Sequence, residues 1–223
     1  MTFRLFCQAV LKFALGGAMV AALLFLSAGT VRYPQAQLFL ALLLIPMFLC
    51  GLFLMVRNPA LLRSRLQVRE TRSRQSLVIR LSGLLFLAAF LSAGLSFRFG
   101  FWMLPRWVTL AGTVLFLLSY ALYGEVLREN SCLSRTIRVQ NGQTVVDTGL
   151  YSIVRHPMYA VTIVLFLSMP LVLGSALSFL CMLPYPFVLV GRIRDEETVL
   201  RQDLAGYEDY CRRIRWRLVP GLW

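Results

Sequence analysis

Two polar clusters border a long apolar segment and carry the residues best suited to chemistry. The first covers residues 155–159 and reads Arg-His-Pro-Met-Tyr, and the second covers residues 192–197 and reads Arg-Ile-Arg-Asp-Glu-Glu. The segment between them, residues 160–191, contains no Lys, Arg, Asp, Glu or His. Because charged groups are costly near a bilayer, their position at the ends of an apolar segment indicates a functional site.

The first cluster has the pattern of a helix N-terminus. Proline disfavours helix at the residue before it and is well tolerated as a first helical residue, so Pro157 is expected to begin a helix at the membrane surface. Free backbone N–H groups at such an end favour an anion. His156 can donate and accept hydrogen bonds without a fixed charge. An arginine that caps the helix and a histidine bound to a backbone carbonyl explain this motif equally well.

The second cluster places a cation and a carboxylate on one helix face. Arg192 and Glu196 are i,i+4 neighbours, whereas Asp195 and Glu197 are expected to point elsewhere. A cation beside a carboxylate could orient a zwitterionic ligand. From the spacing alone, a simple ion pair between Arg192 and Glu196 is the favoured interpretation.

The composition is that of an integral membrane protein. The chain is 58% hydrophobic and 15% charged, whereas soluble domains are about a quarter charged. Its net charge of +13 lies in loops between apolar segments, where the positive-inside rule and anionic headgroups account for it, so nucleic acid is not expected as a partner. Five scattered cysteines without a CxxC pair and a single histidine predict neither a disulfide framework nor a metal site.

The apolar pattern predicts an all-α, polytopic helical bundle with about five spans, the last of which is a helical hairpin. The hairpin is expected over residues 158–191, with breaks near 169–170 and 174–175, and it returns to the side that it entered. The Arg-rich segments 57–80 and 192–217 then share the cytoplasmic face. The other four spans are expected at residues 13–31, 36–56, 81–97 and 108–126.

The polar segments carry further predictions. Part of 57–80 could be an interfacial helix, although a mere orientation signal explains its charge equally well. The Asn141-Gly142 pair predicts a small hairpin over residues 139–146. Residues 193–213 have a charged helical pattern that Gly206 interrupts.

Residues 138–223 resemble the isoprenylcysteine carboxyl methyltransferase family of integral membrane methyltransferases, which is itself similar to the phospholipid N-methyltransferases. The first 130 residues match only in being helical spans. The matching motifs are Thr148-Gly149-Leu150-Tyr151, Arg155-His156-Pro157-Met158-Tyr159, Glu196-Glu197, Gly206-Tyr207-Glu208-Asp209-Tyr210 and Pro220.

The resemblance implies two regions and a site for S-adenosylmethionine that is unlike a Rossmann fold. Residues 1–130 supply spans and the basic loop, and residues 131–223 form the cytosolic cofactor site. Arg192 would match the residue that orients the substrate carboxylate. Gln143 stands where the family often has histidine. The cofactor contacts would fall on Gln140, Gln143, Thr144, Val145, Val146, Tyr151, His156, Pro157, Met158, Tyr159 and Glu196.

This implied site is chemically consistent with the residues. Glu196 could bind the ammonium group of the cofactor, and the helix N-terminus at Pro157 could bind its carboxylate. Tyr151 and Tyr159 offer aromatic faces to adenine or to the sulfonium. A carboxylate acceptor is already nucleophilic and needs no general base, which favours O-methylation of a lipid-like or prenylated carboxylate that enters from the bilayer.

Three other functions remain open from the sequence. They are a phospholipid N-methyltransferase, an NADPH-dependent membrane reductase of the sterol reductase type, and a non-catalytic scaffold that grips anionic headgroups. The chain is expected to be a multi-pass protein of a bacterial inner membrane, with residues 57–80 and the C-terminus in the cytoplasm.

Overall fold

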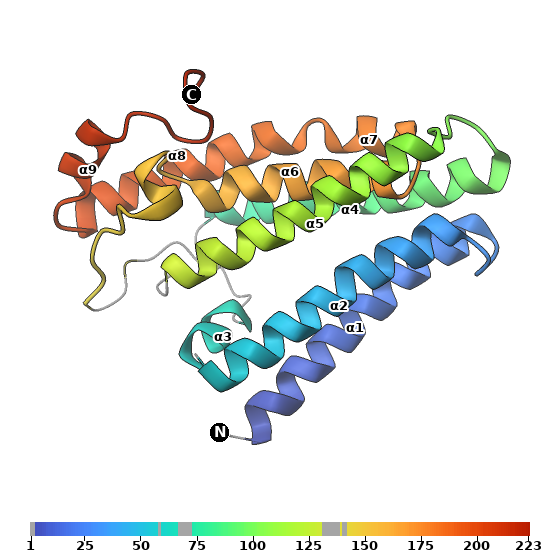
Figure 1. Cartoon of the computed structure of the whole chain (residues 1–223), viewed down its shortest axis with the longest axis horizontal. Coiled ribbons are helices and arrows are strands. Elements are labelled where there is room, and N and C mark those ends of the chain that lie inside the picture. The colour runs from blue at the N-terminus through green and yellow to red at the C-terminus, as the bar shows by residue number, and fades with distance from the viewer. Residues whose placement is uncertain (1–2, 58, 67–72, 131–138, 140–141) are drawn as a thin grey trace.

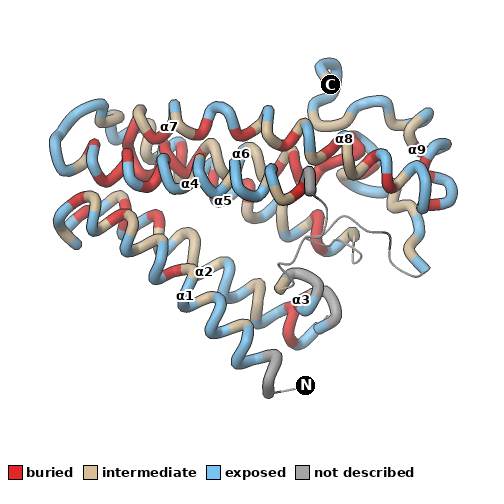
Figure 2. Tube along the Cα trace, turned by 180° about the vertical axis from the view of Figure 1, so that it is seen from behind, coloured by how far each residue is buried: buried red, intermediate tan, exposed pale blue. Residues whose placement is uncertain are grey.

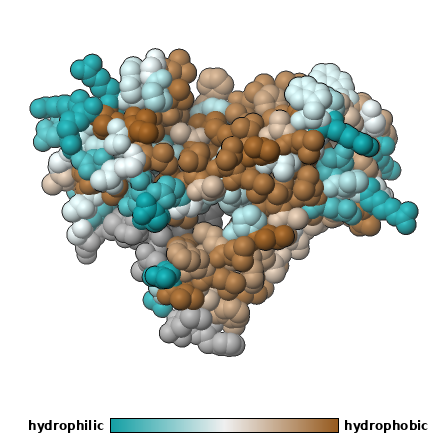
Figure 3. All heavy atoms as spheres, viewed as in Figure 1, coloured by the Kyte–Doolittle hydropathy of each residue, from teal (hydrophilic) through white to brown (hydrophobic). Residues whose placement is uncertain are grey.

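The computed structural model describes residues 3–57, 59–66, 73–130, 139 and 142–223, and this part of the chain is helical with connecting turns. Its helices include five that are long and apolar enough to cross a membrane, which confirms the all-α, polytopic prediction. Apolar side chains form a band across the middle of the molecule and hydrophilic residues gather at its two ends (Figure 3). These spans are Phe6–Ala28, Pro34–Arg57, Gln75–Phe99, Arg106–Glu129 and Ala176–Asp203.

The first two helices form an antiparallel pair beside the rest of the bundle. Helices α1 (Phe3–Ala28) and α2 (Pro34–Arg57) are followed by the short helix α3 (Pro59–Leu66). The pair lies close to the other helices near its own connection and diverges from them toward the N-terminus (Figure 1). Buried Tyr33 fastens the close end, because its hydroxyl donates to the carbonyl of Leu173 at 2.7 Å.

The helix that follows begins earlier than hydropathy predicts. Helix α4 spans Ser73–Phe99, whereas the apolar pattern places the third span at 81–97. Hydropathy marks the apolar part of a helix, and the residues before it, such as Gln75, have good helix propensity. Helix α3 lies in the first part of the basic segment 57–80, for which an interfacial helix was one of the two interpretations.

The predicted helical hairpin is present. Helix α6 (Pro157–Val172) runs along α5 (Arg106–Glu129) and is followed by α7 (Ala176–Met182) and α8 (Tyr185–Asp203), which return along it (Figure 1). Gly174, at φ 70°, makes the turn, and the Ser175 hydroxyl caps α7 by accepting from the N–H of Ser178 at 3.1 Å. Helix α8 continues past the apolar segment, so the second polar cluster lies within this return arm.

The segment before the hairpin departs from its prediction. Residues 143–147 form neither helix nor strand, so the predicted small hairpin over 139–146 is not seen among the residues described there. Gln140 and Asn141, at its turn, lie outside the described residues. A short 3-10 helix, η1 (Gly149–Ser152), leads into α6, and α9 (Tyr207–Arg213) follows α8 after Gly206, at φ 81°.

Buried residues concentrate along α4 to α8 (Figure 2). Helices α5 and α6 approach closely at Gly112, where an added Cβ would lie 2.5 Å from the Cβ of Leu171. This close packing fixes α6 against α5. The polar clusters thus meet at the end of the bundle where α6 begins.

Candidate functional site

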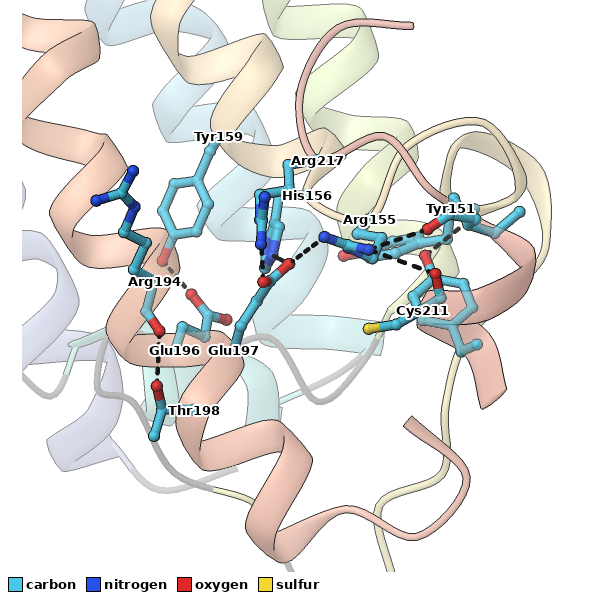
Figure 4. Close-up of polar contacts among 12 residues, drawn as sticks. Tyr151, Arg155, His156, Tyr159, Arg194, Glu196, Glu197, Thr198, Cys211 and Arg217 are labelled. Atoms are coloured by element: carbon cyan, nitrogen blue, oxygen red, sulfur yellow. Dashed lines mark hydrogen bonds and ion pairs between the residues drawn. The ribbon is translucent and has the colours of Figure 1, made fainter. Parts of the chain in front are cut away.

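The two polar clusters of the sequence lie beside each other. The first forms the N-terminus of α6, and the second lies on the facing part of α8 (Figure 4). Their side chains form two groups, and each group contains one of the two adjacent glutamates of α8, Glu196 or Glu197. One group centres on Glu197 and the other on Tyr159.

The Glu197 cluster is a buried carboxylate held by three basic side chains. Its Oε1 lies 2.9 Å from Nη2 of Arg155 and 3.2 Å from Nε2 of His156, and its Oε2 accepts from Nε of Arg217 at 3.0 Å (Figure 4). The Glu197, Arg155 and His156 side chains are each 5% exposed. A buried charge is tolerated only when it is paired, so this cluster is a structural requirement of the fold.

Arg155 also fastens the C-terminal segment to the start of α6. Its Nη1 donates to the carbonyl of Ile214 at 3.2 Å, and its backbone N–H donates to the backbone carbonyl of Trp216 at 2.9 Å. The backbone N–H of His156 donates to the carbonyl of Arg217 at 2.9 Å. The interpretation of His156 as a ligand of a backbone carbonyl is therefore wrong for its side chain, which contacts Glu197.

The Tyr159 network links α4, α6 and α8, and it consists of Tyr159, Arg192, Glu196, Gln75 and Asp195. The Tyr159 hydroxyl donates to Oε2 of Glu196 and accepts from Nε of Arg192 at 2.9 Å. The Arg192 Cζ atom also lies 6.0 Å from the centroid of the Tyr159 ring. The phenol therefore bridges Arg192 and Glu196, which share one helix face as predicted.

Gln75 extends this network onto α4. Its side chain is fully buried, its Oε1 accepts from Nη1 of Arg192 at 2.9 Å, and its Nε2 donates to Oδ2 of Asp195 at 2.7 Å. The prediction that Asp195 points away from this face is thus wrong. Glu197 does face elsewhere, toward Arg155.

Tyr151 lies next to Arg155 of the Glu197 cluster (Figure 4) and is hydrogen-bonded to Tyr210 and Asn130. Its carbonyl accepts from the Tyr210 hydroxyl at 2.7 Å, and its own hydroxyl accepts from Nδ2 of Asn130 at 3.1 Å. Burial raises the pKa of Tyr210, so that phenol remains a donor. Glu129 accepts from the backbone N–H of Leu150 at 3.1 Å, which anchors η1 to the end of α5.

The loop residues that the resemblance assigns to the cofactor are dispersed. Gln143 is half-buried and Thr144 is exposed. Val145 packs in a cluster with Leu204 and the α9 tyrosines, and Val146 packs with Tyr151. Gln140 lies outside the described residues.

Sequence reasoning missed Glu197, Arg217 and Gln75. The Glu196-Glu197 pair in the sequence was a signal for Glu197, since two adjacent acids on a helix face different neighbours. Nothing in the sequence marks Gln75 or Arg217, because their partners lie far away along the chain.

An apolar cavity of about 530 Å³ lies farther along the bundle. Helices α1, α2, α4, α5 and α6 line it, and α6 contributes residues beyond Tyr159 toward its C-terminus. Among the described residues, no group of three or more His, Cys, Asp and Glu side chains could hold a metal ion. The cavity lining is Met19, Val20, Leu23, Phe39, Leu43, Gly83, Phe86, Leu87, Phe90, Phe116, Tyr120, Leu165, Phe166 and Met169.

Fold and site together define a polytopic helical membrane protein with a polar, charged site at one end of the bundle. The family model of the isoprenylcysteine carboxyl methyltransferases matches residues 110–202, a stretch that contains both polar clusters. Through this region, the chain is similar to the isoprenylcysteine carboxyl methyltransferase family.

Two individual proteins are similar to this chain. A solved structure of the eukaryotic intramembrane Ras methyltransferase ICMT has a TM-score of 0.59 and 18% sequence identity, over 96% of this chain and 77% of that one. At that identity the likeness concerns the fold. The Delta(14)-sterol reductase TM7SF2 of Mus musculus is 31% identical over 88 residues, which are 38% of this chain and 21% of the reductase.

Proposed function

We propose that the protein is an S-adenosylmethionine-dependent methyltransferase that methylates a lipid-like acceptor, with a carboxylate as the methylated group. One observation carries the proposal: Arg192, Tyr159 and Glu196 form one hydrogen-bonded series at the polar end of an apolar bundle. All three residues lie within the segment that matches the methyltransferase family, residues 110–202.

The residues present fit the proposed cofactor. Glu196 is half-buried and offers a carboxylate for an ammonium group, and the Tyr159 ring lies next to it for a cation–π contact with a sulfonium. When bound, S-adenosylmethionine supplies an electrophilic methyl group, so a carboxylate acceptor needs no base. Of the other residues that the resemblance assigns to the cofactor, His156 and Tyr151 already bind protein partners and are proposed to shape the site from behind.

Arg192 is proposed to bind and orient the acceptor carboxylate. A guanidinium holds a carboxylate through two parallel hydrogen bonds, which fixes the direction of its oxygens. The Tyr159 hydroxyl holds Arg192 from one side at Nε, and Gln75 holds it at Nη1. Such preorganisation is the main contribution a site can make when the nucleophile needs no proton transfer.

The apolar cavity is proposed to hold the acceptor's hydrocarbon part. Its lining is almost wholly apolar and its volume of about 530 Å³ lies within the range of ligand pockets. Both the cavity and the Arg192 site contact α6, so one acceptor could present its polar end to Arg192 and its chain to the cavity. We place the polar end on the cytoplasmic face, because the basic loops lie there by charge bias.

The experiment is a labelled-methyl transfer assay with purified protein. The acceptors are prenylated thiol acids, their methyl esters and phospholipids with a primary amine. Label on the free acids alone supports O-methylation, and label on the amine lipid supports the N-methyltransferase alternative. No label on any acceptor would contradict the proposal.

A membrane reductase is the second candidate, because the sterol reductase of Mus musculus is 31% identical over 88 residues. A ligand stabilises the protein that binds it, so the two candidates differ in which cofactor raises the melting temperature. S-adenosylhomocysteine is expected to raise it and NADPH to leave it unchanged. A rise with NADPH alone would favour the reductase.

A further inference from the structure

The fully buried Gln75 side chain stands between a cation and a carboxylate of the same helix. Arg192 and Asp195 are i,i+3 neighbours on α8, a spacing at which a direct ion pair is within reach. The Gln75 amide contacts both: its oxygen accepts from Arg192 and its nitrogen donates to Asp195. It comes from α4, which is remote in sequence from both partners.

An amide suits this position because it is both donor and acceptor without carrying charge. Its two ends satisfy a guanidinium and a carboxylate at 2.9 Å and 2.7 Å, respectively. Each hydrogen bond to a charged partner is stronger than one between neutral groups. The Arg192 guanidinium is thereby held at Nη1 by Gln75 and at Nε by Tyr159, which defines its plane.

Resting on the proposed function, we propose that Gln75 is a positioning residue for acceptor binding. It keeps Asp195 engaged so that this carboxylate does not compete with the acceptor for Arg192. It also holds the guanidinium toward Tyr159 and Glu196. Gln75 thus determines acceptor affinity from a helix outside the segment that matches the methyltransferase family.

The test compares Gln75→Leu with the double variant Gln75→Leu/Asp195→Asn in the labelled-methyl assay. The single variant is expected to raise KM for the carboxylate acceptor about tenfold or more, by loss of a hydrogen bond to a charged group. Its kcat and its affinity for S-adenosylhomocysteine are expected to change by less than about threefold. The double variant is expected to lower KM part of the way back to the wild-type value, because the competing carboxylate is gone while the amide that holds the guanidinium is still missing.

Two further variants make the outcome decisive. Gln75→Glu is expected to raise KM as well, since the new carboxylate binds Arg192 directly, and it tests the idea if Gln75→Leu does not fold. Gln37→Leu is the matched control, because the Gln37 side chain is exposed on α2 and its Nε2 donates to the carbonyl of Val31. An unchanged KM in both Gln75 variants would overturn the inference, as would a KM in the double variant as high as in Gln75→Leu. An inactive wild type would instead refute the proposed function.

Discussion

At the scale of residues, the site uses each of two adjacent acids for a different purpose. Glu196 shares a hydroxyl with Arg192 and is half-buried, whereas Glu197 is enclosed by basic groups. The helical spacing predicted which residues share a face, because it depends only on the local geometry of α8. The spacing could not identify the contact partners of each face, because Gln75 and Arg217 belong to other parts of the chain.

Removing the Tyr159 hydroxyl tests the bridge between Arg192 and Glu196. Tyr159→Phe keeps the ring but leaves Arg192 without the phenol oxygen, so kcat/KM is expected to fall about tenfold or more. Steady-state methyl transfer measures this. Tyr33→Phe is the control, because the Tyr33 hydroxyl donates to the carbonyl of Leu173 at the other end of the bundle. Equal losses in the two variants would contradict the role of the hydroxyl.

Neutralising Glu197 tests the structural role of its cluster. Glu197→Gln keeps the side-chain shape but leaves the buried Arg155 without its counter-charge, a loss of roughly 3 kcal/mol. A large fall in melting temperature is expected in thermal unfolding in detergent. Glu208→Gln, on the exposed side of α9, is expected to leave that temperature unchanged. Equal losses of stability in the two variants would contradict the structural role of the Glu197 cluster.

At the scale of elements, α6 connects the site to the membrane interior. It begins at the polar clusters, packs closely on α5 and contributes to the apolar cavity. The absence of charge over 160–191 and the turn signals near 174–175 predicted the hairpin that contains α6. The charged helical pattern of residues 193–213, interrupted at Gly206, predicted that helix continues past the apolar segment, as α8 does to Asp203 and α9 does after Gly206.

Two glycines of α5 test the packing of α6. Gly112→Ala puts a Cβ 2.5 Å from the Cβ of Leu171 and is expected to destabilise the protein. Gly124→Ala meets no atom within 4 Å and is expected to stabilise α5 by up to about 1 kcal/mol through helix propensity. Thermal unfolding of both variants measures this. A more stable Gly112→Ala protein would show that α5 and α6 do not pack as described.

Filling the apolar cavity tests its role in acceptor binding. Gly83 lines the cavity and has open space around its Cα, so Gly83→Phe is expected to occupy that space. Turnover of long-chain acceptors should fall about tenfold, while short-chain acceptors and S-adenosylhomocysteine bind as before. Gly51→Phe, also in open space but on α2 outside the lining, is the control. Unchanged chain-length preference would exclude the cavity as the acceptor site.

At the scale of the whole molecule, composition and charge patterning predicted the all-α membrane bundle. Burial of apolar residues in a bilayer follows from hydropathy alone, and so the spans are readable from sequence. The polar network at the end of the bundle cannot be predicted from the sequence in this way, because it depends on how α4, α6 and α8 pack against one another. The small hairpin predicted from Asn141-Gly142 shows the same limit, since local turn propensity does not decide the conformation of 143–147.

Calorimetric titration of the purified wild-type protein with S-adenosylhomocysteine is the most direct test of the central claim. We predict saturable binding that weakens at least about tenfold in Glu196→Ala, because the carboxylate for the ammonium group is lost. The control Glu125→Ala, on an exposed ion pair of α5, should bind as the wild type does. No binding by the wild type, or equal binding by Glu196→Ala, would contradict the account.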